Sequence, residues 1–122
     1  MTDKPLAVVT GGAGFIGSHM VDLLVECGYR VHVIDNLSGE REANISHHLG
    51  NSDVAFENVD IRSCESDHKL FEGAKYVFHL AGIGDIVPSI ERPGEYLSVN
   101  VQGTVHALEC ARAAGSVEKF VY

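Results

Sequence analysis

The sequence lacks the features of membrane-spanning, secreted and disulfide-bonded proteins. No apolar run approaches the roughly 20 residues that a membrane-spanning helix needs, and the N-terminal residues contain no signal-peptide core. The three cysteines, Cys27, Cys64 and Cys110, are odd in number and form no CxxC pair. They therefore predict reduced, mostly buried thiols, and we expect a cytoplasmic protein without a membrane partner.

Positive charge is also scarce. Lysine and arginine number 9 against 17 aspartates and glutamates, so the net charge is −8. This balance argues against nucleic acid as a partner. It is compatible with an anionic cofactor, because helix N-termini and backbone amides bind phosphate without lysines. No repeat, linker or low-complexity segment divides the chain, so residues 1–122 are expected to form one domain.

Metal-binding spacing is missing as well. None of the seven histidines belongs to an HExxH or comparable motif, and we expect no metal site. His79 lies near the end of the strand predicted at residues 75–81, where a hydrogen-bonded core histidine is a more frequent finding than an acid–base catalyst. We assign it no catalytic role.

Strand and helix patterns alternate along the chain. Apolar runs predict strands at residues 6–10, 30–35, 54–60, 75–81 and 119–122. Helical periodicity predicts helices at residues 15–27, 41–49, 65–72 and 95–114, with a loop containing Pro88 and Pro93 before the last helix. The alternation predicts an α/β, doubly wound parallel sheet with helices on both faces. By analogy with dinucleotide-binding folds, we expect the strand order 3-2-1-4-5.

The two longest predicted helices each carry one apolar stripe, as amphipathic helices do. In the first helix the stripe consists of Ile16, Met20, Leu23, Leu24 and Cys27. In the last helix it consists of Leu97, Val101, Val105, Leu108 and Ala111.

A glycine-rich segment joins the first predicted strand to the first helix. It reads TGGAGFIGSH from residue 10 to residue 19 and fits both GxGxxG and GxxGxxG. A plain tight turn needs one or two glycines, whereas this one has four within seven residues. We predict that Gly11 and Gly14 allow close approach to a pyrophosphate and that Gly17 allows close helix–strand packing.

Asp35 ends the second predicted strand, eighteen residues after Gly17. A carboxylate at this place accepts hydrogen bonds from the adenosine ribose hydroxyls. It also repels the 2′-phosphate of NADP, so the sequence favours NAD. Arg41 is the counter-argument, since an arginine after this strand can hold a 2′-phosphate, but it does not remove the carboxylate. Without the glycines, Asp35 would be an ordinary strand-end turn residue.

Three further segments are candidates for the site, and two of them are open to two interpretations. Asp60 and Ile61 either contact the adenine amino group and ring or are a polar strand end and a core residue. The small residues after His79 leave room for a cofactor. Asn100 is a poor helix-interior residue, which indicates close packing against cofactor or backbone, or a tolerated surface position.

Together these residues resemble the extended short-chain dehydrogenase/reductase superfamily, and in particular nucleotide-sugar epimerases and dehydratases of the UDP-glucose 4-epimerase type. The matching segments are residues 10–19, 35–38, 59–62, 79–82, 89–93, 100–104 and 119–122. The resemblance implies a Rossmann fold, tightly held NAD, and Asn36 beside Asp35 at the ribose. The resulting candidate cofactor-binding residues are Gly11, Gly14, Phe15, Ile16, Gly17, Asp35, Asn36, Ser38, Asp60, Ile61, Leu80, Ala81, Gly82 and Asn100.

The resemblance also implies a mechanism that these residues do not complete. In the family, hydride moves from C4 of the sugar to nicotinamide while a tyrosinate takes the hydroxyl proton, and a lysine four residues later lowers that tyrosine's pKa. No tyrosine of this sequence has a lysine at that spacing. We therefore expect a truncated NAD-binding domain without catalytic residues or substrate domain. The nucleotide-sugar substrate would bind only to the full-length parent.

Two other functions are compatible with the sequence. The chain could be a stand-alone nucleotide-binding or regulatory module without catalysis, or a structural domain that dimerises without ligand. Long helices of the resembling family commonly form a four-helix dimer interface. The last predicted strand would also be an unpaired sheet edge, and such edges recruit partners. We therefore expect a homodimer or another form of self-association.

Overall fold

The computed structural model describes residues 3–37, 42–63 and 69–122 and contains one sheet of five parallel strands. The strands are β1 (Leu6–Thr10), β2 (Arg30–Asp35), β3 (Val54–Asn58), β4 (Ala74–His79) and β5 (Lys119–Val121). Their order, β3-β2-β1-β4-β5, confirms the predicted α/β topology, with β3 and β5 at the edges. The third and fourth strands end two residues earlier than predicted.

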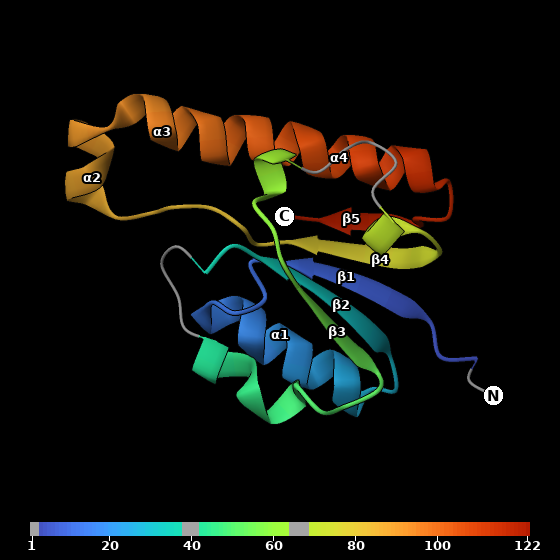
Figure 1. Ribbon diagram of the computed structural model, residues 1–122. Helices are drawn as coiled ribbons and strands as arrows, with labels where there is room; N and C mark the ends of the chain where they lie inside the picture. The colour runs from blue at the N-terminus through green and yellow to red at the C-terminus, as the bar shows by residue number, and fades with distance from the viewer. Residues whose placement is uncertain (1–2, 38–41, 64–68) are drawn as a thin grey trace.

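Helices cover both faces of the sheet (Figure 1). One face carries α1 (Phe15–Glu26) and the 3-10 helix η1 (Glu42–His48), and the other carries α4 (Gly103–Ala114). The 3-10 turns η2 (Ile61–Ser63) and η3 (Lys69–Phe71) contact α4. Of the helix predicted at residues 65–72, the part from 65 to 68 lies outside the described residues. In the part of the chain that the structure describes, no helix has the length and apolar character to cross a bilayer.

Strand β1 is buried on both sides, as its unbroken apolar sequence predicts. Leu6 and Val8 belong to the core beneath α4, whereas Ala7 and Val9 belong to the core beneath α1. The alternation follows from the two-residue period of a strand. Burying each of these larger side chains contributes roughly 1.5–3 kcal/mol, so β1 ties both layers together.

In α1, part of the predicted apolar stripe does not pack against the sheet. The buried residues of the helix are Gly17, Ser18, Val21 and Leu24, while Ile16 is 67% exposed. The glycine at residue 17 brings the start of the helix against the turn before it, and this contact sets which face is buried. At this end of α1, the close approach of the helix to the preceding turn therefore decides which face is buried, and the size of the apolar side chains does not.

The predicted stripe of the last helix is also mostly exposed. Its four larger members are 46–63% exposed: Leu97, Val101, Val105 and Leu108. The face on the sheet consists of small residues, which are Gly103, Ala107, Cys110 and Ala111. Small side chains let the helix lie close to β4 and η2, and the large apolar series then points away from the sheet.

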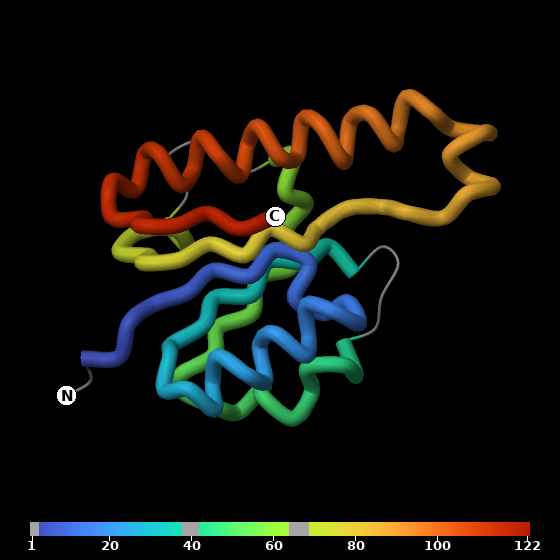
Figure 2. Tube along the Cα trace, turned by 180° about the vertical axis from the view of Figure 1, so that it is seen from behind, coloured from blue at the N-terminus to red at the C-terminus, as the bar shows by residue number. Residues whose placement is uncertain are grey.

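The segment with two prolines is helical, and the predicted loop there is wrong. It forms α2 (Ile86–Glu91) and α3 (Pro93–Leu97), and α2 projects beyond the sheet (Figures 1 and 2). Pro93 is the first residue of α3, and Pro88 lies in the first turn of α2. Amides of a first turn have no acceptor within their helix, so proline costs little there. A π-helical turn, η4 (Ser98–Gln102), joins α3 to α4.

Gly17 offers a direct test of this packing. A Cβ added there would lie 2.0 Å from the carbonyl oxygen of Gly11. We expect Gly17→Ala to lower the free energy of unfolding by about 2 kcal/mol, because overpacking outweighs the gain in helix propensity. Urea denaturation measures the effect. The matched control is Gly94→Ala in α3, where the added Cβ meets nothing within 4 Å. A Gly17 variant as stable as this control would contradict the assignment.

Candidate functional site

A cleft of about 320 Å³ lies at the carboxyl ends of the inner strands. In a doubly wound sheet this is where ligands bind, next to the reversal of strand order between β1 and β4. Several predicted site residues line it: Gly11, Gly14, Asp35, Asn36, Asp60, Ile61, Leu80, Ala81 and Gly82. The cleft also contains Arg62, Asp85 and Glu95, which the sequence analysis did not assign to the site.

The turn after β1 brings two backbone segments into contact. Gly11 has φ +70°, and an added Cβ would lie 2.7 Å from the amide nitrogen of Ala81 and from the carbonyl carbon of Leu80. Its own N–H donates to the carbonyl of Ile34 at 2.7 Å. Both the conformation and the space therefore require glycine. The result is a cleft floor made of backbone, as a phosphate group needs.

The N-terminus of α1 opens beside this floor. Its N-cap, Gly14, has no side chain to cap the helix, and the first turn contains no acidic residue. The amide of Ser18 makes a bond back to Gly14, so the amides of the residues between them have no acceptor in the helix. Phe15 and Ile16 are 75% and 67% exposed and do not line the cleft with their side chains. Their contribution to an anion site is confined to the backbone.

Asp35 is held at the cleft edge by the chain itself. The residue is 8% exposed, and its carboxylate accepts from the amide of Ala13 at 2.9 Å and from that of Leu37 at 2.8 Å. Leu37 has φ +60°, which turns the chain immediately after β2. A carboxylate has about four acceptor positions, so two are left for hydroxyl groups in the cleft. Ser38 and Arg41 lie outside the described residues.

Asp60 and Arg62 form an ion pair inside the cleft. The guanidinium approaches both carboxylate oxygens, with Nη2 2.6 Å from Oδ2 and Nε 3.0 Å from Oδ1. Arg62 is the main reason that the pKa of Asp60 falls to about 2, and burial opposes the shift. Asn36 also donates to Asp60 at 3.4 Å. Ile61 is 4% exposed and packs in the core near Gly103, which favours the structural interpretation for this residue.

A buried hydrogen-bond chain joins β1, β4 and α4. The Thr10 hydroxyl accepts from the amides of Leu80 and Ala81, both at 3.1 Å, so it donates its own hydrogen to Nδ1 of His79 at 2.7 Å. His79 is therefore neutral and protonated on Nε2, which donates to the Thr104 hydroxyl at 3.0 Å. Thr104 in turn donates to the backbone of η4. His79 is thus a buried, hydrogen-bonded histidine, as predicted, and it joins the cleft floor to α4.

Asn100 is used by the backbone in the described structure. Its amide oxygen accepts from the N–H of Ile83 at 2.9 Å, and its amide nitrogen donates to the carbonyl of the same residue at 3.0 Å. An added Cβ at Gly82 would lie 3.0 Å from that oxygen. Of the alternatives for Asn100, packing against backbone is the one that the geometry favours. These two hydrogen bonds hold the loop that follows β4 against η4.

A second cluster lies outside the cleft. Asp22 of α1 and His47 and His48 of η1 place possible metal ligands within 4.8 Å of one another. The expectation of no metal site came from spacing along the chain, and these residues come from two separate elements. The adjacent histidines were the one signal in the sequence. Of the cysteines, Cys110 is buried and Cys27 is exposed, so burial holds for only one of these two, and Cys64 lies outside the described residues.

The fold and the cleft define a Rossmann-type domain, and comparison with known proteins extends this result. The model of the NAD dependent epimerase/dehydratase family matches residues 7–122. A putative UDP-glucose 4-epimerase from Methanocaldococcus jannaschii is 39% identical over 118 residues, which cover 96% of this chain and 37% of that protein. The chain belongs to the NAD-dependent epimerase/dehydratase family, and the predicted family and the NAD cofactor agree with it.

Solved structures show the same likeness. A UDP-N-acetylglucosamine 4-epimerase from Methanobrevibacter ruminantium M1 superimposes with a TM-score of 0.84 at 31% identity, covering 100% of this chain and 38% of that one. A dTDP-glucose 4,6-dehydratase from Streptomyces venezuelae, solved with NAD bound, gives 0.87 at 33% identity, covering 96% and 38%. The chain thus spans less than two fifths of the length of these relatives.

The hydrogen-bond chain through His79 predicts a pH dependence. Burial lowers the pKa of His79 below its ordinary value, so the unfolded chain takes up this proton at higher pH than the folded chain. The contribution of His79 is fully present above the unfolded pKa of about 6.5 and is lost as the pH falls below it. We expect the stability advantage of the wild type over His79→Gln to shrink between about pH 7 and pH 5. Urea titrations at several pH values measure it, and a constant advantage would contradict the assignment.

Proposed function

We propose that this chain binds NAD in the cleft as the cofactor-binding part of a nucleotide-sugar epimerase or dehydratase, and that it turns over no substrate alone. One observation carries the proposal: Gly11 lies against the backbone of Leu80 and Ala81 beside an uncapped helix N-terminus. Such a corner offers amide groups and a positive helix end to a pyrophosphate. A side chain at residue 11 would fill it.

The adenosine half of NAD is then recognised by the neighbouring strand ends. Asp35 accepts hydrogen bonds from the ribose hydroxyls, with Asn36 and Ser38 in the same segment. Asp60 lies further along the cleft, where Arg62 keeps its carboxylate ionised. When bound, NAD supplies a nicotinamide ring that accepts and returns hydride. The residues of this chain bind and orient the cofactor, and we assign none of them to proton transfer.

The nucleotide-sugar substrate would bind only to a longer protein that contains this domain. Residues 1–122 act as one NAD-binding domain, and a UDP-sugar or another nucleotide sugar binds to residues beyond these. The named relatives include both 4-epimerases and a 4,6-dehydratase, so the proposal covers both reactions. A stand-alone nucleotide-binding or regulatory module is the second candidate. Coding sequence for that pair directly downstream would support the first candidate, whereas a natural stop codon would support the second.

Calorimetric titration tests the cofactor site. We expect NAD to bind more than tenfold tighter than NADP, because a 2′-phosphate about 4 Å from Asp35 costs up to about 4 kcal/mol. Asp35→Ala should weaken NAD binding by about 10- to 100-fold, as a charged hydrogen bond contributes roughly 1.5–3 kcal/mol. The same variant should also reduce the ratio of the NAD affinity to the NADP affinity.

Glu26→Ala, at the far end of α1, removes the same charge outside the cleft and is the control for that titration. Circular dichroism establishes that both variants are folded. Equal NAD affinity of the Asp35 and Glu26 variants would contradict the ribose assignment. Turnover of a nucleotide sugar by the purified 122-residue chain would contradict the second half of the proposal.

We also propose that the chain self-associates through α3 and α4. The exposed series Leu97, Val101, Val105 and Leu108 recurs at helical spacing, and an apolar face of this kind is typical of an interface. A second copy of the chain could bury it by packing helix against helix.

Sedimentation velocity tests the helix interface. We expect the wild type to form a dimer and the double variant Val105→Asp/Leu108→Asp to be a monomer, since charges on the apolar face are not buried without cost. Ala113→Asp places one such charge on an exposed position of α4 outside the series and should leave the dimer intact. A monomeric wild type would refute self-association, and dissociation of the Ala113 variant would refute the proposed face.

A further inference from the structure

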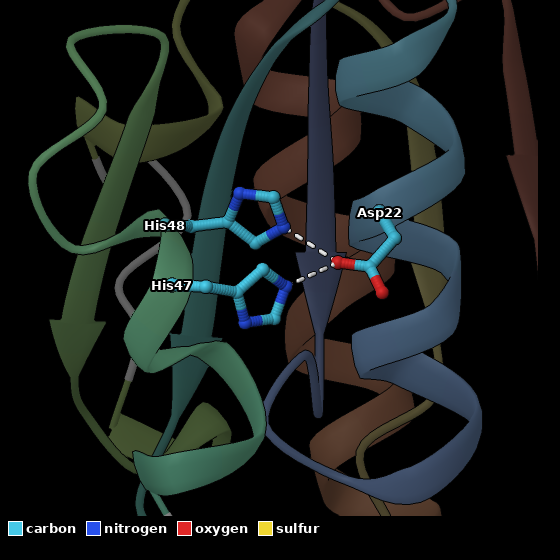
Figure 3. A group of neighbouring side chains, drawn as sticks. All are labelled: Asp22, His47 and His48. Carbon is cyan, nitrogen blue, oxygen red and sulfur yellow. Dashed lines mark hydrogen bonds and ion pairs between the residues drawn. The ribbon is translucent and has the colours of Figure 1, made fainter.

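The cluster outside the cleft has the composition of a transition-metal site. Figure 3 shows the imidazoles of His47 and His48 side by side on η1, both directed at the carboxylate of Asp22 on α1. Nε2 of His47 is 2.7 Å and Nε2 of His48 is 2.6 Å from the same oxygen, Oδ1. Two adjacent residues of a helix normally point in different directions, yet here two nitrogen atoms converge on one point.

The burial of the three side chains leaves the point of convergence open on one side. The side chain of His48 is 10% exposed, whereas those of His47 and Asp22 are 55% and 47% exposed. The two imidazole rings are 4.1 Å apart between centroids. In the described structure each Nε2 faces Oδ1 of Asp22, so each carries the hydrogen of that hydrogen bond. Zinc binding would replace these two hydrogens, because an imidazole nitrogen binds a metal in its unprotonated form.

Asp22 supplies the negative charge. Its side chain is 47% exposed, and its Oδ1 is the atom on which both histidines converge. Two imidazoles and one carboxylate make a donor set that zinc accepts. Magnesium and calcium prefer all-oxygen sites, so this set disfavours them.

We propose that Asp22, His47 and His48 bind one zinc ion, with water at the remaining position. Zinc lies about 2.0–2.1 Å from its nitrogen and oxygen ligands, which places two tetrahedral ligand atoms about 3.3 Å apart. The nitrogen–oxygen separations of the cluster are shorter by about 0.7 Å. Asp22 is half-exposed, and a rotation of its side chain opens this space. All three ligands come from this chain.

The zinc ion would join α1 to η1 next to the cofactor turn. On the same 3-10 helix, Asn44 donates to the carbonyl of Ala13 at 2.7 Å, and the amide of Ala13 donates to Asp35. The metal therefore holds an element that already supports the turn. Because zinc binds the folded chain better than the unfolded chain, it raises the unfolding temperature.

Zinc titration of tag-free protein tests the proposal. The protein is stripped of metal by chelator, and zinc is added in competition with a chromophoric chelator. We expect one zinc per chain and a rise of several degrees in the unfolding temperature. His47→Ala should weaken zinc binding at least tenfold. His47 is exposed, so this variant should fold, and His48→Ala and Asp22→Asn then test the other ligands.

His19→Ala is the matched control, since it removes an exposed imidazole from α1 and leaves the cluster intact. Its zinc affinity should equal that of the wild type. Cobalt supplies a second readout, because its visible absorption reports low-coordinate nitrogen and oxygen ligation, and His47→Ala should lose that absorption. Absence of zinc binding by the wild type, or equal binding by His47→Ala and His19→Ala, would overturn the proposal and leave the cluster as hydrogen bonds only. Neither outcome bears on NAD binding, which is measured separately.

Discussion

The contact between Gly11 and the backbone of Leu80 and Ala81 is the constraint around which the molecule is organised. It brings the turn after β1 to the end of β4 with no side chain between them. The hydroxyl of Thr10 holds both amides of that segment, and His79 orders the direction of the hydrogen bonds. The floor of the cleft is thus backbone that is held in place by hydrogen bonds from its own chain.

Small residues determine how closely the two helical layers lie on the sheet. Gly17 seats α1 on its own turn, and Gly103 seats α4 on Ile61. The large apolar side chains of both helices then lie outside the closest contacts. Along α3, η4 and α4 they form an exposed series, and at the start of α1 the side chains of Phe15 and Ile16 project into solvent. The closest contact of each helix is therefore made by a glycine.

Much of the architecture could be predicted because it follows from local pattern. Unbroken apolar runs mark buried parallel strands, and β1 is the clearest case. The glycine-rich turn and Asp35 could be predicted to lie together because the carboxyl ends of parallel strands lie on the same side of a sheet. The predicted apolar stripes are only partly buried: Leu24 and Ala111 lie in the core, whereas most of the larger members are exposed. Periodicity ranks residues by hydrophobicity, whereas the closest contacts of these two helices depend on small size. The loop around Pro88 and Pro93 was wrong because proline is tolerated in a first helical turn.

The sequence by itself determined the order of strands and helices, the glycine turn and the acidic residue that closes β2, since each depends on neighbours in the chain. Only the tertiary structure decided the pairing of Asp60 with Arg62 in the cleft, the tautomer of His79 and the use of Asn100 by the backbone. It alone brought Asp22 to His47 and His48. These last features depend on distances between side chains of different elements, and spacing along a chain does not encode such distances until the sheet has assembled.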